Sequence, residues 1–153
     1  YKIWENGIYI KDKTKVYWGG MIVDGADPET FEELGEENLA KDKEHVYSGD
    51  SILEKLDPAL LKYIGGPYYL YKNNVLYLGS ASLLGKKRKL DTDIDGKNYT
   101  YMGDELIKDK RNVYYAGQRL KEVKTEEVNN PEDAKKLKKK IIDGLLGIQK
   151  IRR

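Results

Sequence analysis

The chain has 153 residues, of which 39% are hydrophobic and 35% charged, so it is long enough for one domain with a real core. It contains no cysteine, which excludes disulfide scaffolds, cysteine-containing metal sites and thiol catalysis. The net charge is +2, but residues 131–153 hold eight Lys or Arg and three Asp or Glu, so the rest of the chain is weakly acidic. A weakly acidic body argues against a broad nucleic-acid-binding face there.

The compartment is left open by the sequence. No stretch approaches the length of a membrane span, and a chain without cysteine tolerates both reducing and oxidising surroundings. Because the chain begins at Tyr1 rather than Met, we expect a removed leader, a trimmed N-terminus or an excised fragment.

One motif is written several times along the chain. A polar Lys-Asp-Lys segment leads into a Val-Tyr pair and then a glycine. Full copies span residues 11–19, 41–49 and 108–117, and degraded copies span 71–79 and 95–103. In the first two copies and the copy at 71–79, the aliphatic residue and the tyrosine that follows it recur every thirty residues, which indicates an internal repeat. Because the polar segment favours a turn and its flanks alternate, each copy predicts a β-hairpin.

Two Asp-Pro pairs, also thirty residues apart, predict short helices after the first two hairpins. Asp27 and Asp57 are good N-caps, and the proline that follows each one suits the first helical position. We expect helices over residues 27–34 and 57–64, each with an apolar face packed on the hairpin sheet.

The end of the chain predicts a linker over residues 121–130 and a basic amphipathic helix over 131–153. Asn130 is a good N-cap and Pro131 suits the first helical position. The apolar positions recur at helical spacing: Ala134, Leu137, Ile141, Leu145 and Ile148. Gly144 and Gly147 weaken the second half. Three interpretations stay open: a cap on the last hairpin, a helix for a partner's groove, and an anion-binding surface.

These elements predict a β-rich α+β fold. Tandem β-hairpin repeats form one twisted antiparallel sheet over residues 1–120, two short Asp-Pro-capped helices pack on it, and the C-terminal amphipathic helix closes it.

The motif, together with the segment Gly25 to Phe31, resembles the DKNYY family of bacterial repeat proteins over roughly residues 7–120, with the C-terminal helix outside the family pattern. The resemblance implies a repeat protein of unknown function, often exported or attached to the cell surface, and brings no catalytic residues with it.

The leading hypothesis for function is a non-enzymatic protein-binding module, such as an inhibitor or a surface interaction protein. Tyrosine is abundant, with 13 copies, and suits half-buried sheet faces, where the alternative is plain strand packing. The predicted partner-binding residues are the hairpin aromatics: Tyr17, Trp18, Tyr47, Tyr77, Tyr114 and Tyr115. Only one alternating set of them can face outward.

The alternative hypothesis is binding of an anionic ligand, either nucleic acid or a membrane surface, through the basic helix. Its predicted residues are Lys135, Lys136, Lys138 and Lys139. Steep salt dependence is expected if this helix carries the function.

A third hypothesis is a weak structural Ca²⁺ site. Asp91, Asp93, Asp95 and Gly96 match the front of a calcium loop, but Met102 stands where a bidentate glutamate is needed. The competing interpretation is that Asp95-Gly96 is a hairpin turn with two extra acids. No other cofactor is expected.

Nothing in the sequence points to an enzyme. The only histidine, His45, occupies a position that varies among the copies and is expected to be exposed. No nucleophile elbow, phosphate-binding loop or dinucleotide fingerprint is present.

Overall fold

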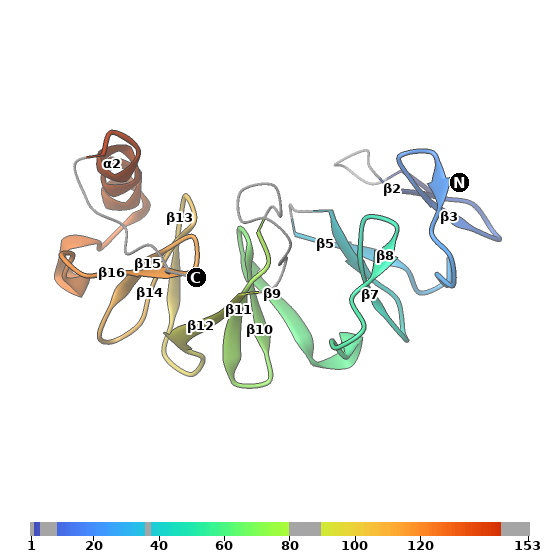
Figure 1. Ribbon diagram of the computed structural model, residues 1–153, viewed down its shortest axis with the longest axis horizontal. Helices are drawn as coiled ribbons and strands as arrows, with labels where there is room; N and C mark the ends of the chain where they lie inside the picture. The colour runs from blue at the N-terminus through green and yellow to red at the C-terminus, as the bar shows by residue number, and fades with distance from the viewer. Residues whose placement is uncertain (1, 4–8, 36–37, 80–89, 145–153) are drawn as a thin grey trace. The chain divides into compact units, whose positions relative to one another are not determined.

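A computed structural model describes residues 2–3, 9–35, 38–79 and 90–144, with side chains over 9–35, 38–79 and 91–144 (Figure 1). This part of the chain is β-rich, its strands pair antiparallel, and its one α-helix is α2 (Pro131–Ile142) near the C-terminus. The β-rich class and the C-terminal helix agree with the sequence.

The strands form four sheets of four strands each. In every sheet, strands that follow one another in the chain are neighbours. The first two sheets contain β1 (Lys2–Ile3), β2 (Tyr9–Lys11), β3 (Val16–Trp18) and β4 (Met21–Ile22), then β5 (Glu32–Leu34), β6 (Leu39–Lys41), β7 (Val46–Ser48) and β8 (Ser51–Ile52). The last two contain β9 (Leu61–Gly65), β10 (Tyr68–Tyr71), β11 (Asn74–Tyr77) and β12 (Leu90–Asp95), then β13 (Thr100–Gly103), β14 (Leu106–Lys108), β15 (Val113–Tyr115) and β16 (Gln118–Leu120).

The prediction of one continuous twisted sheet is therefore wrong. The polar motif does lie in the turn between the second and third strands of the first, second and fourth sheets, where Lys11 pairs with Val16, Lys41 with Val46, and Lys108 with Val113. In the third sheet the equivalent pair is Leu70 with Val75. The sequence alignment of the copy at 71–79 is thus one residue out of register.

The two predicted Asp-Pro helices are also wrong beyond their first turn. Residues 28–30 form a turn, and β5 begins at Glu32. The second segment forms a single 3₁₀ turn, η1 (Pro58–Leu60), before β9 begins at Leu61. The caps are as predicted, since the Asp57 side chain accepts from the Ala59 N–H. The residues that would form further helical turns pair instead in β5 and β9. A helix of one turn is not stable by itself, because nucleation is unfavourable.

The chain divides into two compact units, Tyr1–Tyr63 and Ile64–Arg153, so the boundary lies inside the segment predicted to be one repeat domain. In the first unit, the first sheet packs on the second through a buried cluster that includes Tyr9, Val16, Phe31, Ala40 and Tyr47. The rings of Tyr9 and Phe31 are 5.2 Å apart, and those of Phe31 and Tyr47 are 5.5 Å apart.

The described residues of the second unit form two buried clusters. One lies between the third and fourth sheets and includes Tyr68, Val75, Tyr77, Ile107 and Tyr114. The other lies between the fourth sheet and α2 (Figure 1), and it contains the following residues: Met102, Leu106, Val113, Leu120, Val123, Val128, Ala134, Leu137 and Ile141.

Residues 121–130 are therefore not a linker. They contain the 3₁₀ turn η2 (Thr125–Glu127), and buried Val123 and Val128 join the cluster under α2. The start of α2 is as predicted, because the Asn130 side chain accepts from the Asp133 N–H. The helix ends at Ile142, before Gly144, and the predicted positions Leu145 and Ile148 lie outside the described residues.

Candidate functional site

The aspartate of the recurring motif closes the turn that it belongs to. One carboxylate oxygen, Oδ1, accepts from the backbone N–H groups two and three residues later, which is the geometry of an Asx turn. Distances are 2.7 and 2.8 Å at Asp12, 2.8 and 2.7 Å at Asp42, and 2.8 and 2.8 Å at Asp109.

The second oxygen of the same aspartate joins one sheet to another. Asp42 Oδ2 accepts from the Tyr47 hydroxyl at 2.7 Å and from the Asp27 N–H, in the segment leaving the first sheet, at 3.0 Å. Asp109 Oδ2 likewise accepts from the Tyr114 hydroxyl at 3.1 Å and the Asp95 N–H at 3.2 Å. In the second and fourth sheets, the motif aspartate thus both closes its turn and accepts a hydrogen bond from the segment of the preceding sheet.

Asp12 has the same turn but lacks the inter-sheet donor. Its Oδ2 accepts from the Tyr17 hydroxyl at 3.2 Å, and the carboxylate is half-exposed rather than buried. Backbone N–H groups of Thr14 and Lys15 are the main cause that lowers the pKa of Asp12 to about 2. Burial would raise the pKa of Asp42 and Asp109, but their several donors outweigh it and hold both below the usual range.

The first lysine of the motif ties each hairpin to the segment that leaves its sheet. The Lys11 ammonium donates to the carbonyls of Pro28 and Phe31, the second at 3.3 Å. Lys41 donates to the Pro58 carbonyl at 3.4 Å. The Pro28 and Pro58 carbonyls belong to the first residues of one-turn segments, which are too short to pair most of their own C=O groups.

The fourth sheet contains the same contact. Lys108 donates to the carbonyls of Thr125 at 3.2 Å and Val128, so the partner again lies seventeen residues along the chain. The sequence reasoning missed this role of the lysine, although the constant spacing from Lys to the turn could have revealed it.

Replacing Lys108 with glutamine is expected to lower the free energy of unfolding by about 2 kcal/mol, because two backbone carbonyls lose a charged donor. Lys110, the exposed second lysine of the same motif, is the matched control, and Lys110→Gln should leave stability unchanged. Urea unfolding followed by circular dichroism measures both, and equal effects would contradict the role given to Lys108.

Three of the six predicted partner-binding aromatics are core residues. Tyr47, Tyr77 and Tyr114 are 0%, 4% and 1% exposed, so no partner can reach them in the folded chain. Their rings face a neighbouring sheet, which is the strand-packing alternative that the sequence left open.

Trp18 and Tyr115 are half-buried and also pack on cores. The Trp18 indole lies against Gly49 of the second sheet, where an added Cβ would come within 3.2 Å of the ring. Tyr115 packs on the cluster beneath α2. Of the six predicted residues, Tyr17 is the one whose ring lies on an uncovered sheet face.

Two tyrosines that the sequence did not single out join sheets through their hydroxyl groups. The Tyr9 hydroxyl donates to the carbonyls of Asn38 at 2.7 Å and Gly49 at 2.9 Å, both in turns of the second sheet. In the second unit, the Tyr68 hydroxyl donates to the Glu105 carbonyl at 2.8 Å and accepts from the Gly117 N–H at 3.0 Å.

Alkaline pH is expected to destabilise the fold through these buried phenols. Burial raises the pKa of Tyr114 to about 12, above the ordinary value of 10.0. The stability that its neutral form contributes is complete below pH 10 and is lost as the pH rises toward 12. Urea unfolding at pH 8 and above pH 10, with Tyr114→Phe as the non-titrating control, measures the effect. An identical pH dependence in the variant would contradict it.

Among the described residues, the first sheet leaves one apolar row uncovered. Register places Ile10, Tyr17 and Ile22 side by side on one face, and this row is named the open face. Ile10 is 37% exposed, Ile22 is 46% exposed and Tyr17 is half-buried.

The first two positions of this row are buried in every later sheet, whereas the third position, that of Ile22, is exposed in all four. The residues at the positions of Ile10 and Tyr17 are at most 1% exposed, and they are Ala40 and Tyr47, Tyr69 and Leu76, and Ile107 and Tyr114. Tyr9 of the first sheet and Phe31 of the segment before β5 cover Ala40 and Tyr47. The exposure of Ile10 and Tyr17 is therefore specific to the first sheet and does not follow from their position in the strands.

The predicted calcium residues do not form a loop. Asp91, Asp93 and Asp95 alternate along β12, and among the described residues no cluster of three or more His, Asp or Glu side chains could hold a metal ion. Gly96 lies in a turn that links two different sheets, so the hairpin-turn alternative is also wrong. Glycine is needed there because an added Cβ would collide with the Asn73 carbonyl oxygen.

The lysines predicted to bind an anionic ligand differ in their exposure. Lys135, Lys136 and Lys139 are exposed on α2, whereas Lys138 is half-buried with its ammonium 3.9 Å from an Asp104 carboxylate oxygen. His45 is half-buried rather than exposed, with its ring against Tyr47. Among the described residues, no helix has the length and apolar character needed to cross a bilayer.

The comparison with protein families agrees with this recurring architecture. The sequence model of the DKNYY family matches residues 9–141, which is most of the chain. The chain belongs to the DKNYY family. No curated protein and no solved structure matches it.

The DKNYY match extends further than expected from the motif. It continues past residue 120 through the η2 turn and most of α2, so the helix is within the family pattern and not an addition to it. This extent agrees with the buried cluster that α2 shares with the fourth sheet.

Proposed function

We propose that the four sheets are copies of one structural repeat. Support comes from their common strand order and from contacts that recur at equivalent positions: the aspartate turn, the Lys11-type contact to the leaving segment, and the Tyr9-type hydroxyl bond. On this interpretation, function resides in the surfaces that the repeats leave uncovered.

We infer that the chain is a non-enzymatic protein-binding module that acts through the open face. The observation that carries this proposal is the exposure of Ile10, at 37%, where Ala40, Tyr69 and Ile107 are all completely buried. Two apolar positions that are covered in the other copies favour a partner over the same positions of the first one.

The partner that suits the open face is the apolar face of another sheet of the same kind. Within the chain, such a sheet covers Ala40 and Tyr47, and another covers Ile107 and Tyr114. Asp12 lies beside the open face with an oxygen that, in Asp42 and Asp109, accepts a backbone N–H from the covering sheet. The open face therefore offers the incoming sheet both apolar contact and a charged acceptor.

The test is affinity capture from an extract of the source organism with Ile10→Lys and a matched control. Ile52→Lys is the control, because Ile52 lies in the equivalent row of the second sheet and is 36% exposed. We expect wild type and Ile52→Lys to recover a protein that carries the Lys-Asp-Lys motif, and Ile10→Lys to lose it. Equal recovery by Ile10→Lys, with the fold intact by circular dichroism, would overturn the proposal.

A further inference from the structure

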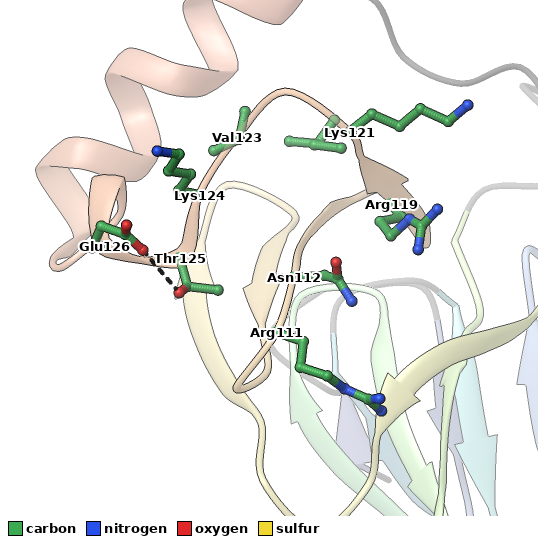
Figure 2. Close-up of a pocket in the computed structure, with 9 residues that line it drawn as sticks. Arg111, Asn112, Arg119, Lys121, Val123, Lys124, Thr125 and Glu126 are labelled. Atoms are coloured by element: carbon green, nitrogen blue, oxygen red, sulfur yellow. Dashed lines mark hydrogen bonds between the residues drawn. The ribbon is translucent and has the colours of Figure 1, made fainter.

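A shallow cavity opens at the edge of the fourth sheet, away from any residue used above for partner binding. Its volume is about 420 Å³, within the range of small-ligand sites. It lies between the hairpin turn that holds Asn112 and the segment that follows β16. Figure 2 shows Arg111, Asn112 and Arg119 extending on one side of it, with Lys124 and Glu126 on the other.

The lining of this cavity is strongly cationic. Four cations, Arg111, Arg119, Lys121 and Lys124, surround it with one carboxylate, Glu126. All four cations and Glu126 are exposed, and buried Leu120 and Val123 also line the cavity.

None of the four cations has an ion-pair partner within the described residues. Asp95 is near enough to Arg111 for that charge to contribute to its lowered pKa, but hydrogen bonds from Asn98 and Lys97 are the larger causes. The Asp95 carboxylate is thus already bonded to its own turn.

The second sheet provides an internal comparison. A cavity of about 280 Å³ opens there on the opposite side of the equivalent turn, lined by two cations and two carboxylates. Lys41 pairs with Glu32 at 3.6 Å, and Lys43 pairs with Asp27 at 3.2 Å. The same backbone architecture is therefore built with balanced charge, so the cationic excess in the fourth sheet is not a requirement of the fold.

Single positions explain the difference. Arg111 stands where Glu44 stands in the second sheet, and Lys124 where Asp57 stands. Arg119 occupies the row position taken by Ile22, Ile52 and Asp91 in the other sheets. Each change adds a positive charge or removes a negative one along the lining of the fourth-sheet cavity. Glu44, Ile52 and Asp57 themselves do not line the cavity of the second sheet.

We propose that this cavity binds a compact oligophosphate. The planar guanidinium groups of Arg111 and Arg119 match phosphate oxygens through paired hydrogen bonds, and the Asn112 amide lies between them as a neutral donor. Lys121 and Lys124 add charge at the rim, which favours a ligand with at least two phosphate groups over a single one.

The test is isothermal titration of the full chain with inorganic tripolyphosphate at low salt. We expect saturable binding of one ligand per chain, weakened by added salt, and a loss of affinity of about tenfold or more in Arg111→Gln/Arg119→Gln. Both arginines are exposed, so this variant should fold normally.

The matched control is Lys135→Gln/Lys136→Gln/Lys139→Gln, which removes more charge from α2 but none from the cavity. Retained affinity in this control is expected. Equal weakening of both variants would overturn the site in favour of general cationic attraction, as would the absence of saturation at millimolar ligand. Tighter binding of a single-stranded oligonucleotide than of tripolyphosphate would overturn the assignment to a compact ligand.

Discussion

Replacing Asp109 with alanine is expected to destabilise the chain by about 3 kcal/mol or more. The substitution leaves three backbone N–H groups without their acceptor, those of Arg111, Asn112 and Asp95. The Tyr114 hydroxyl also loses Asp109 and keeps only the Asp93 carbonyl at 3.3 Å. Because Asp109 is 6% exposed, water cannot easily replace the carboxylate, and each buried donor left unpaired carries its own desolvation cost. Denaturant unfolding of the wild-type and variant chains measures the loss.

Asp12→Ala is the matched control for this prediction. Asp12 closes the same turn and accepts the same tyrosine hydroxyl, but it is half-exposed and has no donor from a second sheet. The difference between the two variants therefore reports the inter-sheet bond and its burial. If both variants lose the same stability, the Asp95 N–H contact contributes nothing and the proposed coupling between the third and fourth sheets is wrong.

Detaching α2 is expected to turn the chain into an end-to-end assembly. In Leu137→Asp/Ile141→Asp, two charges enter the cluster that covers Leu106 and Val113, both completely buried in the wild type. The uncovered face of the fourth sheet is equivalent to the faces that cover Ala40 and Ile107 inside the chain. It should stack on the open face of a second copy, which is a head-to-tail contact that does not close.

Light scattering against protein concentration measures this assembly, and adding Ile10→Lys to the same chain is the control. The triple variant should stay unassembled, because the receiving surface carries a charge. Assembly that persists in the triple variant would indicate nonspecific aggregation and contradict the stacking. If the doubly charged helix unfolds the fourth sheet, Leu137→Ala offers a milder form, expected to cost about 3 kcal/mol.

The sequence predicted local features well where a short segment decides them. The turn at Lys41-Asp42-Lys43, the Asn130 cap of α2 and the caps at Asp27 and Asp57 all depend on residues within a few positions of one another. Such contacts follow from side-chain chemistry and spacing alone.

Features that depend on neighbouring sheets were not predictable in the same way. Tyr17, Tyr47 and Tyr114 occupy the same position of the motif, yet only Tyr17 lies on an uncovered face. The helical conformation of the Asp-Pro segments ends after one turn because the residues that follow pair in strands β5 and β9. Likewise, no local pattern brings Arg111 and Arg119 to one cavity, since Arg111 lies in the turn before β15 and Arg119 in strand β16.

The tyrosine hydroxyl bonds suggest how chains of this family lengthen in evolution. Tyr9 and Tyr68 lie at the same position of the first and third sheets, 59 residues apart by their numbering, whereas Leu39 and Leu106 fill that position in the second and fourth. The unit that is duplicated is then a pair of unlike sheets. The first sheet donates a tyrosine hydroxyl, and the second provides the backbone carbonyl that accepts it. Duplication of one sheet alone would place the tyrosine hydroxyl beside a sheet that does not have the matching backbone carbonyl. Natural members that differ in length should therefore differ by two sheets at a time.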